Sequence, residues 1–277
     1  MIKRSEQLMK QKQERLAAKA ESDGEDEELE MEAEDEDDLT DDEAEQYDSE
    51  GRLIPPTRKF RVLTISSRGI NSRFRHLMLD LQQLLPHIRH EPKMDPRDPI
   101  SVIDEVCDMR SCSHAIFFDC RKHRDLYLSF VKASTGPTLR FFVENVHTLA
   151  EMNLTGNCLK GSRAIISFDE SFESSPKWQL AKEMLSQIFC VPRYHPKSKP
   201  FMDHVFMFSV QDEKIWFRNY QIVEMGERNA AERSLVEIGP RFVLNPVTFY
   251  AGSFGGQVIY KNESFQSPAQ IVRQEKN

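Results

Sequence analysis

The feature that most constrains the fold is an internal repeat of about a hundred residues. After residue 58 the chain runs through a short strand pattern, a helix pattern, a hairpin and a strand led by Gly-Pro. From residue 162 it runs through the same order again. This period is too long for a solenoid unit, so the repeat predicts an α+β fold built from two similar halves in tandem. Corresponding positions include Arg61 and Arg163, Gly136 and Gly239, and Arg140 and Arg241.

Each half is expected to contain one long amphipathic helix, over residues 72–87 and 175–192. Pro86 and the proline-rich segment after it are expected to end the first helix. A shorter helix over residues 100–109 is expected in the first half, and the second half has no clear match to it. The apolar helical positions are Leu77, Leu81, Leu84, Leu85 and Ile88 in the first helix, and Trp178, Ala181, Met184, Leu185 and Ile188 in the second.

The other apolar runs alternate as strands. Each half has a first strand, a hairpin with a polar turn, and a last strand that contains Gly-Pro. The expected strand segments are 61–69, 114–122, 125–133 and 135–146 in the first half, and 162–171, 203–210, 215–224 and 235–247 in the second.

The two Gly-Pro strands share one pattern of alternation. Each has an Arg-Phe pair, Arg140-Phe141 and Arg241-Phe242, so both phenylalanines are expected to face the core and both arginines to face outward. A buried charge would be costly unless it were paired. The shared outward arginine therefore favours a surface role.

Charge divides the chain into three parts. Residues 1–20 carry six Lys/Arg and two Glu, and residues 21–50 carry nineteen Asp/Glu and no Lys or Arg. The remaining residues hold 31 basic and 24 acidic side chains, a net charge of +7, which suggests an anionic partner. The acidic stretch has almost no apolar content and is predicted to be disordered. The predicted organisation is a disordered arm over residues 1–57, first basic and then acidic, a domain over 58–260 with halves of about 58–157 and 158–260, and a C-terminal tail over 261–277.

Motifs for catalysis, metals or cofactors are not found. The sequence has no phosphate-binding glycine loop, no H-E-x-x-H and no nucleophile elbow. Five irregularly spaced cysteines without a C-x-x-C pair argue against a zinc site and a disulfide framework. No segment is long and apolar enough to cross a membrane. The sequence therefore predicts a protein that is not an enzyme, uses no cofactor and has no membrane partner.

Basic side chains gather in four places that could contact RNA phosphates. Three arginines surround the start of the first helix, where Ser72 is expected to be the N-cap, although an ordinary capped helix with solvated arginines is equally consistent. A proline-rich loop carries two lysines, and it is also readable as a plain linker. Arg218 alternates with Trp216 and Tyr220, which could stack on bases or pack against protein. The candidate RNA-binding residues are Arg68, Arg73, Arg75, Arg140, Lys197, Lys199, Arg218 and Arg241.

The segments "RVLTISSRG", "TGPTLRFFVENV", "IWFRNYQI" and "LVEIGPRFVLNP" together resemble the Brix domain of eukaryotic ribosome-biogenesis factors, over about residues 58–260. The resemblance implies two halves similar to the anticodon-binding fold of aminoacyl-tRNA synthetases. It also implies a nuclear, nucleolar assembly factor of the large ribosomal subunit without catalytic activity. Its implied partners are pre-rRNA of the large subunit, a helical assembly factor of the Ebp type, and other proteins of the large-subunit precursor.

Two functions therefore compete. The first is a non-catalytic factor that binds pre-rRNA and partner proteins during assembly of the large subunit. The alternative is a protein-interaction scaffold or chaperone for basic ribosomal proteins, with little direct RNA binding, in which the acidic arm engages the basic partners.

Overall fold

The computed structural model describes residues 60–95, 97–152, 154–192, 195, 197–224 and 233–274. The predicted disordered arm, residues 1–57, lies outside these residues.

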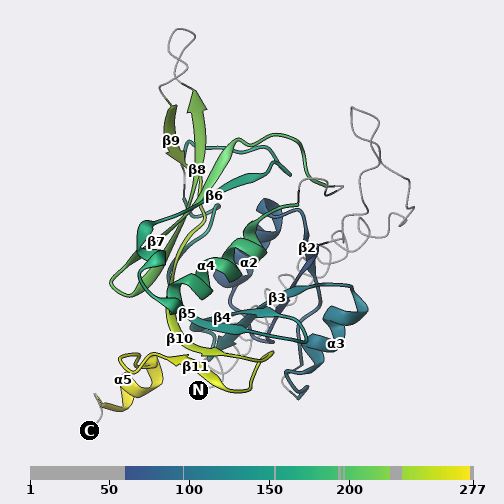
Figure 1. The fold of residues 1–277 in the computed structure, drawn as a ribbon, viewed down its shortest axis with the longest axis vertical. Coiled ribbons are helices and arrows are strands. Elements are labelled where there is room, and N and C mark those ends of the chain that lie inside the picture. The colour runs from purple at the N-terminus through teal and green to yellow at the C-terminus, as the bar shows by residue number, and fades with distance from the viewer. Residues whose placement is uncertain are drawn as a thin grey trace, which may run out of the picture. The chain divides into compact units, whose positions relative to one another are not determined.

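The described strands form one eleven-stranded sheet in the order β2-β1-β3-β4-β5-β10-β8-β7-β6, with β9 paired to β8 and β11 paired to β10 (Figure 1). Three pairs, β1 with β2, β1 with β3 and β6 with β7, are parallel, and the others are antiparallel. The strands are β1 (Val62–Ser66), β2 (Ile88–His90), β3 (His114–Arg121), β4 (Asp125–Lys132), β5 (Thr138–His147), β6 (Ala164–Phe168), β7 (His204–Gln211), β8 (Lys214–Glu224), β9 (Arg233–Glu237), β10 (Arg241–Tyr250) and β11 (Val258–Lys261).

The strand order confirms the prediction of two similar halves. The order β1-β3-β4-β5 of the first half is matched by β6-β7-β8-β10 in the second half, read inward from the other edge. The two Gly-Pro strands, β5 and β10, pair antiparallel at the centre and join the halves into one sheet. The repeat seen in the sequence is therefore a repeat of sheet topology.

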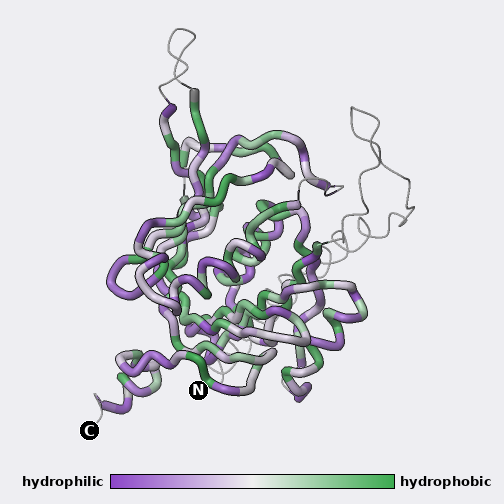
Figure 2. The backbone as a smooth tube through the Cα atoms, in the orientation of Figure 1, coloured by the Kyte–Doolittle hydropathy of each residue, from purple (hydrophilic) through white to green (hydrophobic). Residues whose placement is uncertain are grey.

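The two long helices, α2 (Ser72–Leu84) and α4 (Pro176–Phe189), lie side by side on the same face of the sheet, which we call the inner face (Figure 1). The apolar positions predicted for α4 are all buried. Side chains from both helices and both half-sheets form one hydrophobic core. Within that core Phe217 and Phe242 stack with ring centroids 4.6 Å apart. In Figure 2 hydrophobic colour follows the central strands, and the connecting loops are more hydrophilic.

The opposite, outer face differs between the halves. In the first half α3 (Val102–Met109) covers it, and Ile103 and Cys107 of the helix pack with Leu63, Phe117 and other strand residues in a second hydrophobic cluster. Among the described residues the second half has no helix at the corresponding place, as its sequence indicated. The C-terminal part adds only a short helix, α5 (Pro268–Gln274), after β11.

The first long helix is shorter than predicted. It ends at Leu84 because Pro86 disfavours helical geometry in the residue before it, and Leu85 adopts φ −118° and ψ 92°. Ile88, expected on the helix, instead begins β2, which pairs with β1. Ser72 is the first helical residue, and the N-cap position is held by Asn71 without a side-chain hydrogen bond. The expected helix limit at residue 87 and the Ser72 cap were therefore wrong.

The predicted last strand, residues 235–247, is two strands. β9 and β10 both run along one edge of β8, but the Gly239-Pro240 segment bulges out between them. Gly239 has φ 94° and Pro240 has no N–H to donate, so neither continues the ladder. The buried Asn219 of β8 fills the interruption, since its Nδ2 donates to the Gly239 carbonyl at 2.9 Å.

Candidate nucleic-acid interface

The eight candidate RNA-binding residues do not form one surface. Three lie around the start of α2, two on the loop after α4, and three on outward positions of β5, β8 and β10. In the β5–β10 pairing, Arg140 lies beside Thr248 and Arg241 lies opposite His147, so the two equivalent arginines are at opposite ends of that pairing. The candidates therefore form separate groups.

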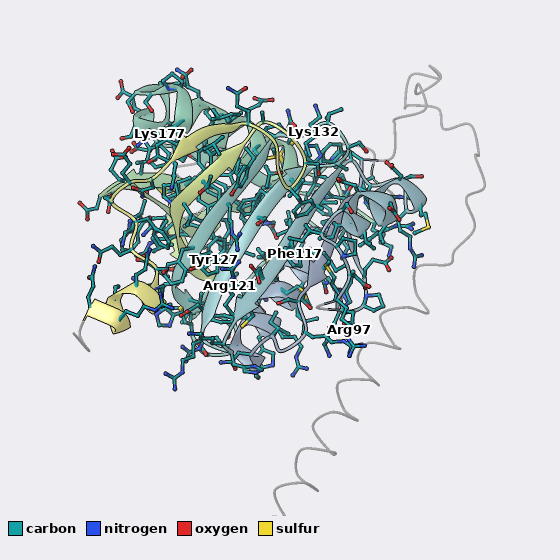
Figure 3. The ribbon with its side chains drawn as sticks, turned by 90° about the horizontal axis from the view of Figure 1, so that it is seen from below. Arg97, Phe117, Arg121, Tyr127, Lys132 and Lys177 are labelled. Atoms are coloured by element: carbon teal, nitrogen blue, oxygen red, sulfur yellow. The ribbon has the colours of Figure 1, made fainter. Side chains whose placement is uncertain are left out.

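Arg140 points away from the core, as the alternation predicted, but it is packed and paired. Its Nη2 donates to Asp119 Oδ2 at 2.6 Å, and its Cζ lies 4.9 Å from the centre of the Tyr127 ring. Arg121 approaches the same ring at 5.1 Å, and Figure 3 shows Arg121 and Tyr127 as neighbours on this part of the sheet. Burial, and then the charge of Arg121, lower the pKa of Arg140. Its guanidinium is thus held by the protein itself.

Arg218 and Arg241 share one carboxylate. Arg241 Nε and Nη2 each donate to Glu237 at 2.8 Å, which is a bidentate pair, and Arg218 Nη1 lies 3.3 Å from Glu237 Oε1. Trp216 and Tyr220 are half-buried on the same face of β8 as Arg218, as predicted, and Ile215 and Phe217 on the other face are buried. Phe242 beside Arg241 is buried too, so the predicted inward phenylalanine is confirmed. Val243, expected on the outward face, is also buried.

The arginines around the start of α2 are more accessible. Arg68 lies 3.3 Å from Asp95, and Arg73 lies 2.8 Å from Glu151. Their side chains are 63% and 57% exposed, so these ion pairs contribute little stability and can be exchanged for a phosphate at small cost. Arg75 lies in the same first turn of α2.

Lys197 and Lys199 are exposed on the loop that follows α4. The Lys199 amide donates to the Gly161 carbonyl at 2.7 Å, so the loop is anchored beside the linker between the halves. Burial, followed by the charge of Lys197, lowers the pKa of nearby His195 to about 4. The positive charge of this loop therefore comes from its lysines and not from a protonated His195.

Sequence reasoning missed the turn between β3 and β4 as a basic element. It holds Lys122, His123 and Arg124, and His123 Nδ1 donates to the Gly69 carbonyl at 2.7 Å. Asn71 Nδ2 also contacts the His123 carbonyl at 3.5 Å. The turn therefore lies against the arginine-containing loop before α2. The run "CRKHRD" carries the signal, but it reads first as a polar hairpin turn.

Within the described residues, no group of three or more His, Cys, Asp or Glu side chains could hold a metal ion. The five cysteines are free thiols, and burial raises the pKa of Cys107 to about 12. No helix in the described part of the chain is long and apolar enough to span a membrane.

Residues 67–248 match the Brix domain, and the chain belongs to the Brix-domain family. It is 50% identical over 237 residues to the ribosome biogenesis protein BRX1 homolog of Xenopus laevis, covering 83% of this chain and 68% of that protein. It is 53% identical over 210 residues to the Homo sapiens BRX1 homolog, with 76% and 58% covered. For ribosome biogenesis protein BRX1 of Saccharomyces cerevisiae the identity is 48% over 235 residues, with 81% of each chain covered.

These identities confirm the predicted family and make the chain a homologue of a ribosome biogenesis protein. The chain spans only 58% of the length of the human relative.

Proposed function

We propose that this protein is a non-catalytic assembly factor of the large ribosomal subunit that binds pre-rRNA and partner assembly proteins in the nucleolus. The observation that carries the proposal is the identity of about half of all aligned residues to ribosome biogenesis proteins, over most of the chain. The proposed partners are pre-rRNA of the large subunit, a helical assembly factor of the Ebp type, and other proteins of the large-subunit precursor.

Charge and sheet geometry support the RNA-binding part. The body after residue 50 carries a net charge of +7, and the exposed candidates Arg68, Arg73, Lys197 and Lys199 lie in loops and in the first turn of α2. Such a surface suits neutralisation of phosphates, with specificity from RNA shape and from co-assembled proteins. The proposed mechanism is therefore to hold an rRNA segment in one arrangement while partners are added, without chemical change to the RNA.

Titration of the full chain with large-subunit rRNA fragments tests this proposal. Fluorescence anisotropy at several salt concentrations should show an affinity that falls steadily as salt rises, because bound cations on RNA are released. An affinity independent of salt would contradict phosphate contacts, and absence of binding at low salt would reject direct RNA binding.

A second candidate function, the protein-interaction scaffold, is favoured by the ion pairs. Carboxylates pair with several of the candidate RNA contacts, namely Arg68, Arg73, Arg140, Arg218 and Arg241. Deleting residues 1–50 separates the two functions. Loss of the protein from assembly complexes with RNA affinity unchanged would favour the scaffold, whereas retention of both would favour RNA binding by the body.

A further inference from the structure

The corresponding ends of the two half-sheets carry opposite charge. Between β1 and the first turn of α2, residues 67–75 contain three arginines and no carboxylate. In the second half, residues 169–179 contain Asp169, Glu170 and Glu173 and only one basic residue. The two segments occupy the same place in the repeat, so one fold presents a basic end and an acidic end.

The hairpin turns repeat this difference. The β3–β4 turn beside the first segment is Lys122-His123-Arg124, whereas the β7–β8 turn beside the second is Asp212-Glu213. Lys177 and Lys182 of α4 contact Glu213 and Glu173, which offsets part of the acidic charge without reversing it. The segment that leads into the long helix and the hairpin turn beside it are therefore both basic in the first half and both acidic in the second half.

Three loops are joined at the basic end. Ser67 Oγ accepts from the Cys120 amide at 2.8 Å, which ties the loop before α2 to the end of β3. Met94 donates to the Ser66 carbonyl at 2.8 Å, which brings in the loop after β2. In Figure 3 Arg97 of that loop lies on the opposite side of the view from Lys177, at the second-half end. The basic end is thus a built surface remote from the acidic one.

An open groove of about 570 Å³ lies at this end, beside the N-terminus of α2. Asn71, Ser72, Arg73 and His76 line one side, and Thr148, Ala150 and Glu151 line the other. Thr148 is fully buried, and its Oγ1 has no hydrogen-bond partner among the described residues. A buried hydroxyl without a partner is costly, so the groove lacks a polar atom that a ligand would supply.

Anions fit the groove better than cations. The first amides of α2 have no intrahelical acceptors, and the helix dipole favours negative charge at that end. Glu151 and the nearby Asp80 are adverse charges, but Arg73 Nε pairs with Glu151 at 2.8 Å and Asp80 accepts from the Leu149 amide at 2.9 Å. The Thr148 hydroxyl is closed to solvent, so it would donate to a phosphate oxygen once the side chains that line the groove move aside.

We infer that an RNA phosphodiester binds at the first-half end, in the groove beside α2 and along the Lys122–Arg124 turn, and that the corresponding acidic end of the second half takes no RNA. This inference rests on the proposed RNA binding and adds its location. RNA then approaches the molecule from one end, and the loop with Lys197 and Lys199 is a lesser contact.

Neutral substitutions in the turn test the location. Lys122→Asn with Arg124→Gln keeps the left-handed backbone at residue 122, where φ is 51° and asparagine is tolerated. The full-length double variant should bind large-subunit rRNA fragments about tenfold more weakly, with the salt slope reduced by about 2. The matched control, Lys132→Gln with Lys261→Gln, removes the same charge at exposed positions away from the groove. It should bind within about twofold of wild type.

Thr148→Val tests the groove itself. It removes the hydroxyl and keeps the shape, so the stability should hold or rise while RNA affinity falls about threefold or more. Equal losses in the turn variant and its control, or unchanged affinity in both the turn variant and Thr148→Val, would overturn the location while leaving RNA binding intact. A wild-type chain that binds no RNA would overturn the proposed function as well.

Discussion

Corresponding residues of the two halves are buried alike on the inner face of the sheet but unequally on the outer face. On the inner face corresponding residues are equally buried: Phe141 is 0% exposed and Phe242 is 1% exposed. On the outer face, Leu63 and Phe117 are 0% and 7% exposed under α3, whereas Ile165 and Met207 at the corresponding positions are 43% and 40% exposed. The strand pattern thus sets the inner face in both halves. An inserted helix present in only one half decides the outer face.

The strongest test of the shared inner face replaces its paired phenylalanines. Phe141→Ala and Phe242→Ala should each lower the free energy of unfolding by about 3–5 kcal/mol, because both leave large cavities in one core. Urea unfolding followed by circular dichroism measures both. His147→Ala, at an exposed position on β5, is the control and should change the stability by less than about 0.5 kcal/mol. A large difference between the two phenylalanine variants would break the equivalence of the halves.

The outer faces should respond unequally. Phe117→Ala removes a ring packed beneath α3 and against Phe254, and should cost about 3 kcal/mol. Met207→Ala, at the corresponding position of β7, should cost less than about 1 kcal/mol, because its side chain is already partly in water. Urea unfolding followed by circular dichroism measures both variants. Equal losses would mean that the second-half outer face is covered by another part of the chain.

His87, just after α2, predicts an effect of pH on stability, to which the buried His195 of the second half adds a similar one. His87 Nε2 donates to the Ile188 carbonyl of α4 at 2.9 Å, and burial lowers the pKa of His87 to about 4. The unfolded chain binds a proton below about pH 6.5 while the folded chain stays neutral. Stability should therefore fall as pH drops from 6.5 to 4, by up to about 3 kcal/mol, and level off below that.

His87→Val isolates this effect, since valine suits a buried position and does not titrate. The variant should lose about 1 kcal/mol at pH 7.5 with the hydrogen bond, but its stability should depend less on pH between 6.5 and 4. The free energy of unfolding, measured at several pH values for the variant and the wild type, tests this prediction. An unchanged pH dependence would exclude His87 as its source.

The equivalent arginines, Arg140 and Arg241, should show the smallest difference in stability between the halves when each is replaced. Arg140→Ala should cost about 1–3 kcal/mol, because it removes a part-buried pair with Asp119 and the contact with Tyr127. Arg241→Ala should cost about 1 kcal/mol or less, since its side chain is 34% exposed against 24% for Arg140 and Arg218 still pairs with Glu237. Fluorescence anisotropy on the same variants should show that Arg241→Ala weakens RNA or partner binding. This loss, as a free energy, should exceed the loss in the free energy of unfolding. The reverse result would assign Arg241 to the fold alone.

Sequence alone was enough for the repeat, the long helices and the burial pattern of the Gly-Pro strands. These follow from local periodicity, because each apolar position repeats at the spacing of its own element. The arrangement around Arg140 was out of reach, because Asp119 and Tyr127 come from other strands and no spacing connects them to it. The β2 edge strand was missed since three residues are too few for a pattern, and the Gly-Pro bulge was hidden because residues 235–247 fit a single strand pattern.

The candidate site was predicted residue by residue but not as a surface. The arginines around the start of α2 were proposed from sequence, whereas the Lys122–Arg124 turn was not, because strand pairing alone brings it beside Gly69. Thr148 carried no signal at all, since a single threonine after a strand is ordinary. Its importance depends on burial and on a missing partner, which only coordinates can provide.

The antiparallel pairing of β5 with β10 has the geometry of a twofold-symmetric dimer interface within a single chain. A separated half would expose the edge of its Gly-Pro strand together with a row of core phenylalanines, and a second copy of that half could satisfy both. Fusion of two copies makes this association permanent and independent of concentration. It also frees each copy to change separately, which is how one end could stay basic while the other became acidic.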